Sequence, residues 1–136
     1  MENPSPERDG YVRQSHIELT DVTADGASGR VEVSDIHHQP YGLVHGGVYC
    51  ALVETLASKG AALCAIEQGM AGAVGVSNQT DFIRATAEGV LLGEATPIHR
   101  GRTQQLWRVV VTREVDGKVA AQGQVRLQNV SDTEAF

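Results

Sequence analysis

The stretch GGVYCALVETLASKGAALCAIEQG, residues 46–69, decides the fold. It is rich in alanine, leucine and valine, it contains no proline, and its last residue, Gly69, is of the type that commonly ends a helix. We therefore predict one long helix over about residues 46–68, roughly 33 Å in length at a rise of about 1.5 Å per residue. A helix that is apolar on most sides is normally buried against other elements. A membrane span is disfavoured, because Glu54 and Lys59 interrupt the apolar run before it reaches about 18 uncharged residues.

Alternating apolar and polar residues on both sides of this stretch predict an antiparallel sheet. Upstream, residues 17–33 contain two short strands separated by a turn at Asp25-Gly26. Downstream, we predict one strand within residues 72–85, a second within 90–99, and a final hairpin whose Asp116-Gly117 pair favours a type I′ turn. Apolar residues share one face of that hairpin: Trp107, Val109, Val111 and Val115 in its first strand, and Val119, Ala121, Val125 and Leu127 in its second.

An apolar sheet face and an apolar helix cover each other when the sheet curls around the helix. The predicted fold class is therefore α+β, with the helix between the second and third strands. The 136 residues are enough for one domain, which we place at residues 11–136, after a polar, flexible tail at residues 1–10. Hydrophobic residues make up 41% of the chain and charged residues 21%, so a packed core can form.

Charge and cysteine content narrow the range of partners and compartments. The net charge of −6 argues against nucleic acid or an anionic membrane as a partner over much of the surface, but it leaves room for a local basic patch. Cys50 and Cys64 lie roughly 21 Å apart along the predicted helix, whereas a disulfide needs Cα atoms within about 7 Å. With no disulfide framework and no signal-like opening segment, we expect a reduced, soluble protein of the cytoplasm.

The segment HHQPYGLVHGG, residues 37–47, leads directly into the predicted helix and is a candidate for chemistry. Glycines at a helix start leave backbone N–H groups approachable, and the helix dipole there favours negative charge. Gly46 and Gly47 could therefore hold an oxyanion, or they could simply allow a tight entry into the helix. The segment contains three histidines, His37, His38 and His45. Their spacing matches no common set of metal ligands and no cysteine is near, so we predict no metal site.

Glu54 is the second unusual feature, because it lies near the middle of the most apolar segment, where an unpaired carboxylate is costly to bury. Ser58 follows one helical turn later on the same face. Two interpretations stay open at this point. Glu54 could face solvent or pair with Lys59 or an arginine, or it could be a catalytic carboxylate whose properties are tuned by burial in a cleft.

These residues together resemble the signature of hotdog-fold acyl-CoA thioesterases. The resemblance rests on Gln39-Pro40-x-Gly42-x-Val44-His45-Gly46-Gly47 followed by Glu54 and Ser58, and downstream on Phe82-Ile83-Arg84-x-x-x-Glu88-Gly89, Pro97-Ile98-His99-x-Gly101 and Gln105-x-Trp107. It covers about residues 36–128. The most similar subgroup hydrolyses aryl and related acyl-CoA thioesters, including hydroxybenzoyl-CoA and dihydroxynaphthoyl-CoA. The resemblance thus implies a hotdog fold and an acyl-CoA substrate.

The same resemblance implies a role for each residue of the signature. Glu54 would be the nucleophile or the general base that attacks the thioester. Gln39 and His45 would orient substrate or water, the Gly46 N–H would polarise the carbonyl oxygen, and Ser58 would assist on the Glu54 side. No metal or cofactor is implied, since CoA is part of the substrate.

The residues that would hold the CoA part of the substrate match the family signature less well. The family often carries Asn-His where this chain has Asp81-Phe82, near the path of the nucleotide. Arginine suits phosphate because its planar fork donates two hydrogen bonds at once. The expected substrate-binding and CoA-binding residues are Gly47, Arg84, His99, Arg100 and Arg102.

The spacing of Gly46 and Glu54 predicts an oligomer. Eight residues of helix separate the two by roughly 12 Å, which is too far for both to contact one thioester group. Two such helices packed antiparallel about a two-fold axis bring the start of one near the middle of the other. We therefore expect a homo-oligomer, at least a dimer, and the resemblance implies a dimer of dimers.

The alternative functions are a non-catalytic acyl-CoA-binding hotdog module and a hotdog dehydratase, since one fold hosts several activities.

Overall fold

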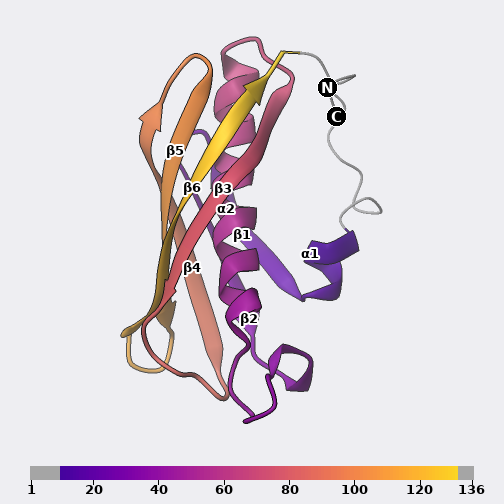
Figure 1. Cartoon of the computed structure of the whole chain (residues 1–136), viewed down its shortest axis with the longest axis vertical. Helices are drawn as coiled ribbons and strands as arrows, with labels where there is room; N and C mark the ends of the chain where they lie inside the picture. The colour runs from indigo at the N-terminus through magenta and orange to yellow at the C-terminus, as the bar shows by residue number, and fades with distance from the viewer. Residues whose placement is uncertain (1–9, 132–136) are drawn as a thin grey trace.

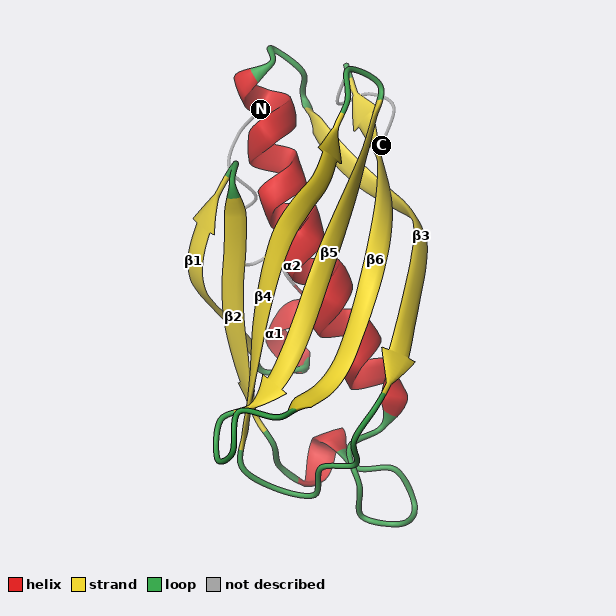
Figure 2. Ribbon diagram, turned by 90° about the vertical axis from the view of Figure 1, so that its left-hand side faces the viewer, coloured by secondary structure: helices red, strands yellow, loops and turns green. Residues whose placement is uncertain are grey.

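One antiparallel sheet of six strands curls around a single long helix (Figure 1 and Figure 2). The structure is a computed structural model that describes residues 10–131. The strands lie in the order β1-β2-β4-β5-β6-β3, and every neighbouring pair is antiparallel. The elements are α1 (Gly10–Gln14), β1 (Ile17–Thr23), β2 (Gly26–Glu32), a 3₁₀ turn (Asp35–His37), α2 (Gly46–Glu67), β3 (Gly72–Phe82), β4 (Val90–Arg100), β5 (Gln104–Arg113) and β6 (Val119–Val130). The predicted α+β hotdog arrangement, with the long helix between the second and third strands, is confirmed.

The predicted helix agrees with α2 to within one residue, because Gln68 is its C-cap and Gly69 adopts a φ of 83° immediately afterwards. α2 lies close to the sheet where the strands carry glycine. A Cβ atom at Gly93 of β4 would lie only 2.6 Å from Leu56 Cδ1, so a larger residue there would force the leucine side chains of the helix to shift. By length and composition alone α2 could cross a membrane, but 56% of its most apolar 18-residue stretch is buried within the fold. That burial is typical of a core helix.

A buried polar cluster ties α2 to the end of the sheet. The Trp107 indole N–H donates to Gln105 Oε1 at 2.8 Å, and Gln105 Nε2 in turn donates to the Ala61 carbonyl oxygen and to Asn129 Oδ1. Asn129 Nδ2 donates to the carbonyl oxygens of Gly101 and Arg102, which fixes the β4–β5 turn. The Gln105-x-Trp107 pair therefore has a structural role, as the centre of a hydrogen-bonded network in the core.

We expect Gly60→Ala to destabilise the protein, because a Cβ atom at Gly60 would lie 2.6 Å from the ring of the fully buried Trp107. Overpacking of this kind costs about 1–3 kcal/mol, and the better helix propensity of alanine offsets at most about 1 kcal/mol. The free energy of unfolding, measured with urea, should therefore fall. The matched control is Gly10→Ala in α1, where a Cβ atom meets nothing within 4 Å. Equal stability of the Gly60→Ala protein and the wild type would contradict this packing.

The hairpin between β5 and β6 differs from the prediction. The connection is longer than two residues: the Arg113 N–H donates to the Lys118 carbonyl oxygen and the Gly117 N–H donates to the Arg113 carbonyl oxygen. Asp116 stabilises this turn by pairing with Arg113 and accepting from the Lys118 N–H. Val115 therefore lies in the turn and is 86% exposed, so its predicted place on the apolar face is wrong. The bonds of the Asp116 side chain favour this longer turn over the predicted two-residue turn.

Residues 1–9 of the expected tail lie outside the described residues, and Gly10 already begins α1. Cys50 and Cys64 are both free thiols, as their spacing on one helix predicted. Cys64 is buried and accepts a hydrogen bond from Gln68 Nε2, whereas Cys50 is half-buried.

Candidate active site

The start of α2 is capped by the side chain of His45. The Gly47 N–H donates to His45 Nδ1 at 2.8 Å, so Nδ1 is the unprotonated ring nitrogen and the neutral ring carries its proton on Nε2. Of the two N–H groups expected to be approachable, that of Gly47 is therefore engaged within the chain. The Gly46 N–H belongs to the first turn, where backbone donors have no partner within the helix. Gly46 is thus the better placed donor for an oxyanion.

Gln39 lies half-buried in the loop before α2, and its backbone and side chain are both held. The Gln39 N–H donates to the Leu43 carbonyl oxygen at 2.7 Å, and the Gly42 N–H donates back to the Gln39 carbonyl oxygen. The Tyr41 N–H donates to Gln39 Oε1. Because the amide oxygen is occupied, the NH₂ group of Gln39 is the part of the side chain available to donate to a bound molecule.

His37 connects this loop to the N-terminal segment. It is only 2% exposed, its Nδ1 accepts from the Ser34 N–H at 3.0 Å, and its Nε2 lies 2.7 Å from the Ser15 carbonyl oxygen. These two partners require a bare Nδ1 and a protonated Nε2. Its own carbonyl oxygen accepts from the His45 N–H at 2.8 Å. One buried side chain therefore positions α1 and the loop relative to each other.

We expect His37→Phe to lower the free energy of unfolding by about 1–3 kcal/mol, because the Ser34 N–H and the Ser15 carbonyl lose their shared partner while the ring volume is kept. Thermal unfolding measures the change. The neighbouring His38→Phe is the matched control: its Nε2 bonds one carbonyl oxygen, that of Ala87, at an exposed site. A His37→Phe protein as stable as the control would contradict the positioning role.

A cavity of about 210 Å³ lies beside the helix start and contains three of the predicted residues: Gln39, Gly46 and Arg84. The Phe82 ring covers Gly46 so closely that a Cβ atom there would lie 2.3 Å from the ring. Phe82 also packs on Tyr49, with ring centroids 5.7 Å apart, and burial raises the pKa of the Tyr49 hydroxyl. Phe82 is thus both the departure from the family signature and a wall of this cavity.

Glu54 lies on the side of α2 that the sheet leaves open, and in the single chain it is exposed. A Cβ atom at Gly75 of β3 would lie 3.4 Å from the Glu54 carboxyl carbon, so the carboxylate lies over the strand where no side chain intervenes. Asn78 of β3 donates to the Cys50 carbonyl oxygen one turn earlier and holds the strand against the helix. Of the two interpretations of Glu54, the one in which it faces solvent therefore holds within one chain, because one sheet covers only one side of the helix.

A second cavity of about 240 Å³ surrounds Glu54, and its other lining residues are Tyr11, Gly47, Cys50, Ala51, Thr55 and Asn78. It shares no residue with the cavity beside Gly46. Ser58 is half-buried one turn beyond Glu54 and lines neither. Glu54 and Gly46 thus occupy separate places on one continuous helix.

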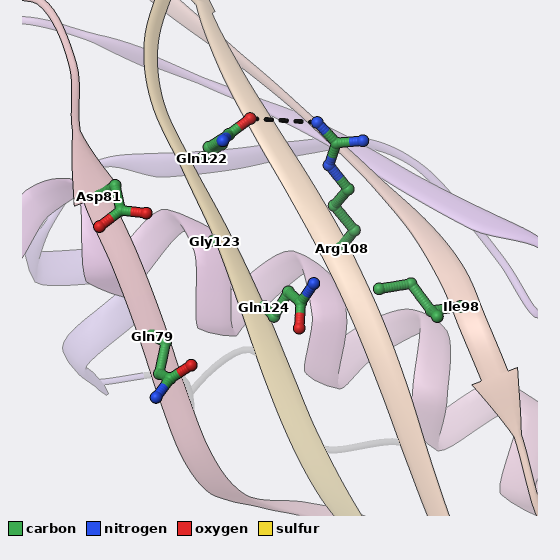
Figure 3. Close-up of a pocket in the computed structure, with 7 residues that line it drawn as sticks. All are labelled: Gln79, Asp81, Ile98, Arg108, Gln122, Gly123 and Gln124. Carbon is green, nitrogen blue, oxygen red and sulfur yellow. Dashed lines mark hydrogen bonds between the residues drawn. The ribbon is translucent and has the colours of Figure 1, made fainter.

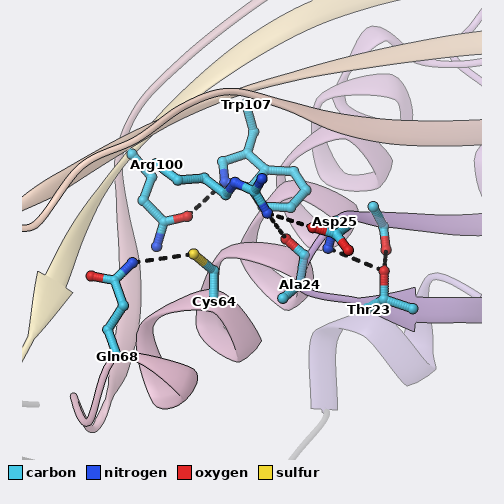
Figure 4. Close-up of polar contacts among 9 residues, drawn as sticks. Thr23, Ala24, Asp25, Cys64, Gln68, Arg100 and Trp107 are labelled. Atoms are coloured by element: carbon cyan, nitrogen blue, oxygen red, sulfur yellow. Dashed lines mark hydrogen bonds and ion pairs between the residues drawn. The ribbon is translucent and has the colours of Figure 1, made fainter.

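Three predicted CoA-binding residues lie at the opposite end of the sheet. Arg100 ends β4 near the last turn of α2 and donates to Asp25 Oδ1 at 2.6 Å and to the Ala24 carbonyl oxygen (Figure 4). His99 and Arg102 are its exposed neighbours. Arg84 is at the other end, where its guanidinium donates to the Val119 carbonyl oxygen. One chain therefore does not bring Arg84 together with His99, Arg100 and Arg102.

The outer face of the sheet has a hollow that contains none of the predicted site residues. This hollow measures about 500 Å³, with α2 behind the strands (Figure 3). Most of its lining side chains are polar, and Arg108 donates there to Gln122 Oε1 at 3.0 Å. Within residues 10–131, no group of three or more His, Cys, Asp or Glu side chains is placed to hold a metal ion.

Sequence reasoning missed two residues beside Glu54. Asn78 belongs to a strand that the pattern predicted, but the pattern does not reveal which side chain reaches α2. Tyr11 lies in the short helix α1 and lines the cavity around Glu54. No sequence pattern points to Tyr11, because the aromatic content of 4% does not reveal which aromatic residue lines a pocket.

Comparison with known proteins identifies the family. The model of the thioesterase superfamily matches residues 41–120. The chain is 46% identical to Rv1847 of Mycobacterium tuberculosis, which is named as an esterase, over 84% of this chain and 81% of the relative. A solved structure of that protein superposes with a TM-score of 0.87 over 90% of this chain and 98% of the other, at 41% identity.

Two further relatives carry thioesterase names. The proofreading thioesterase EntH of Cronobacter turicensis is 36% identical over 76% of this chain and 74% of its own length. The structure of thioesterase HI1161 from Haemophilus influenzae has a TM-score of 0.81 at 30% identity, over 88% of this chain and 82% of that one. Together with the family match, the fold and the arrangement of the loop and helix, these likenesses show that the chain belongs to the thioesterase superfamily and is a thioester hydrolase of the hotdog fold.

Proposed function

We propose that the protein hydrolyses an acyl-CoA, with an aryl or medium-chain acyl group, to the free acid and CoA, and that Glu54 is the catalytic carboxylate. The observation that carries this proposal is the place of Glu54: its carboxylate lies over the bare backbone of Gly75, in a small cavity on the open face of α2. The carboxylate is therefore accessible to a bound thioester. A non-catalytic module has no need for an acid at this place.

Two chemical routes are compatible with this carboxylate. As a nucleophile, Glu54 attacks the thioester carbon, CoA leaves as the thiolate and is protonated, and water then hydrolyses the mixed anhydride. As a general base, Glu54 removes a proton from a water molecule that attacks the same carbon. In both routes the negative charge that develops on the carbonyl oxygen is stabilised by the Gly46 N–H at a helix start, and the Gln39 NH₂ group donates to the substrate.

We propose further that each site combines two chains. Gly46 and Glu54 lie eight residues apart on one continuous helix, roughly 12 Å by the helical rise, and they line separate cavities, so the donor and the acid of one chain are too far apart to act on the same carbonyl. The open face of α2 lies beside β3, an edge strand of eleven residues on which Val76 is 55% exposed. Long apolar edges are normally covered. A second copy packed about a two-fold axis would cover both surfaces and bring its Gly46 to the Glu54 of the first copy.

We assign the binding of the CoA part of the substrate to cationic residues. Arg84 borders the cavity that contains Gly46 and would donate to phosphate from there. His99, Arg100 and Arg102, at the other end of the sheet, would belong to the same site only if a neighbouring subunit supplied them. We also propose a dimer of dimers and a cytoplasmic location, the second because both described cysteines are free thiols, as is usual in a reducing compartment.

Thiol release tests the proposed function directly. Benzoyl-, phenylacetyl- and medium-chain acyl-CoA are incubated with the protein, and free CoA is detected with a thiol reagent. We expect turnover of at least one of these thioesters. Calorimetry on the same thioesters detects the alternative, because binding without CoA release would indicate a binding module. A dehydratase would instead remove water from a 3-hydroxyacyl-CoA and leave the thioester intact.

A further inference from the structure

We propose that Tyr11 determines acyl-group specificity by placing its ring over a compact, flat acyl group bound beside Glu54. The inference rests on the proposed function and names the part of the substrate that occupies the cavity around Glu54. It is carried by the position of α1, which lies on the side of α2 away from the sheet (Figure 1). It is also carried by the chemistry of the cavity walls.

Tyr11 is placed at this cavity without being part of the core. Its side chain is 69% exposed, yet it lines the cavity that contains Glu54 and also a neighbouring one that contains His45. Gly47 is the other residue common to both. Tyr11 thus borders both the cavity that contains the catalytic carboxylate and the one beside the start of the helix. An aromatic ring of this kind offers a flat apolar face at one end and a hydroxyl that stays in water at the other.

The backbone that carries Tyr11 is fixed by three contacts. The Tyr11 carbonyl oxygen accepts from the Ser15 N–H at 2.9 Å, and the Ser15 carbonyl oxygen is bonded to the buried His37. The next residue, Val12, packs against the hydrophobic core. His37 also bonds the loop that leads to His45. The backbone of Tyr11 therefore keeps a defined position relative to the loop before α2, and the ring extends from this fixed point.

The remaining walls favour a compact uncharged group. Apart from Glu54 they are small or neutral, namely Gly47, Cys50, Ala51, Thr55 and Asn78, and none is a cation. A pocket that lacks cations is unsuited to the phosphates of CoA. The part of the cavity that one chain forms measures about 240 Å³. A single aromatic ring suits this space better than a long chain, and stacking on Tyr11 would favour it over an aliphatic group of similar length.

The test compares benzoyl-CoA with propionyl-CoA. For Tyr11→Ala we expect the ratio of their kcat/KM values to fall about three- to tenfold through loss of activity on benzoyl-CoA alone, which is the usual strength of an aromatic pair. Tyr11→Phe keeps the ring and should keep the ratio. The matched control is Arg13→Ala on the same short helix, because Arg13 lines neither cavity. Circular dichroism and size-exclusion chromatography verify that the variants are folded and associated.

Binding provides a readout that does not depend on turnover. Phenacyl-CoA, a thioether that cannot be hydrolysed, should bind about three- to tenfold more weakly to Tyr11→Ala than to wild type, and equally well to Tyr11→Phe. An equal loss for benzoyl- and propionyl-CoA, or no loss for either, would overturn the assignment. If the wild type released CoA from no thioester, the proposed function would fail, and phenacyl-CoA binding would still decide the role of Tyr11. Unchanged binding by Tyr11→Ala, or no binding by wild type, would then refute it.

Discussion

Replacing Glu54 with glutamine should lower kcat by at least about 10²-fold while the protein stays folded, because the amide can neither attack the thioester nor accept a proton from water. Glu54 is exposed in the single chain and takes no part in the hydrophobic core, so its neutralisation leaves the packing of α2 unchanged. The substitution also keeps the shape of the side chain over Gly75. Steady-state thiol release with the best acyl-CoA substrate measures the effect.

The matched control for this variant is Glu67→Gln, which changes the same residue type at the exposed C-terminal end of the same helix. We expect it to keep wild-type turnover. Wild-type turnover by Glu54→Gln would remove Glu54 from the mechanism. If kcat falls as expected, single-turnover hydrolysis in heavy-oxygen water separates the two routes, since only an anhydride intermediate transfers solvent oxygen to the enzyme carboxylate.

Much of the fold could be predicted because its signals are local. A proline-free, apolar stretch closed by Gly69 predicts the ends of α2 to within one residue. Alternation of apolar and polar residues predicts the strands, since successive side chains point to opposite faces. The error at Val115 arose where local propensity was insufficient: Asp116-Gly117 suits a two-residue turn, but the side-chain bonds of Asp116 stabilise a longer one.

The candidate site was less predictable because its geometry depends on long-range packing. The motif identifies Gln39, Gly46 and Glu54, but not that Glu54 lies on the open face of α2, which depends on where glycines let the helix approach the sheet. The ion pair of Arg100 with Asp25 joins residues far apart in sequence, so no local pattern reveals it. Tyr11 is likewise brought to Glu54 only by the anchoring of α1.

Mixing two inactive variants should restore activity, because each proposed site takes its loop from one chain and its acid from the other. In Glu54→Ala both sites of the dimer lack the carboxylate. In the double variant Gln39→Ala, His45→Ala both sites lack the orienting loop groups. A mixed dimer carries all the substitutions in one site and leaves the other intact. Random mixing should therefore recover about a quarter of wild-type activity, since half of the dimers are mixed and each has one working site.

The decisive measurement is thiol release after the two variants are denatured together and refolded, with the mixed dimers verified by differential tagging. The shared-site account predicts clear recovery in this mixture. It predicts none when Glu54→Ala is mixed with Glu54→Gln, because both substitutions then affect the same half of every site. Full activity of a monomeric wild type, or no recovery in the first mixture despite verified mixed dimers, would contradict the account.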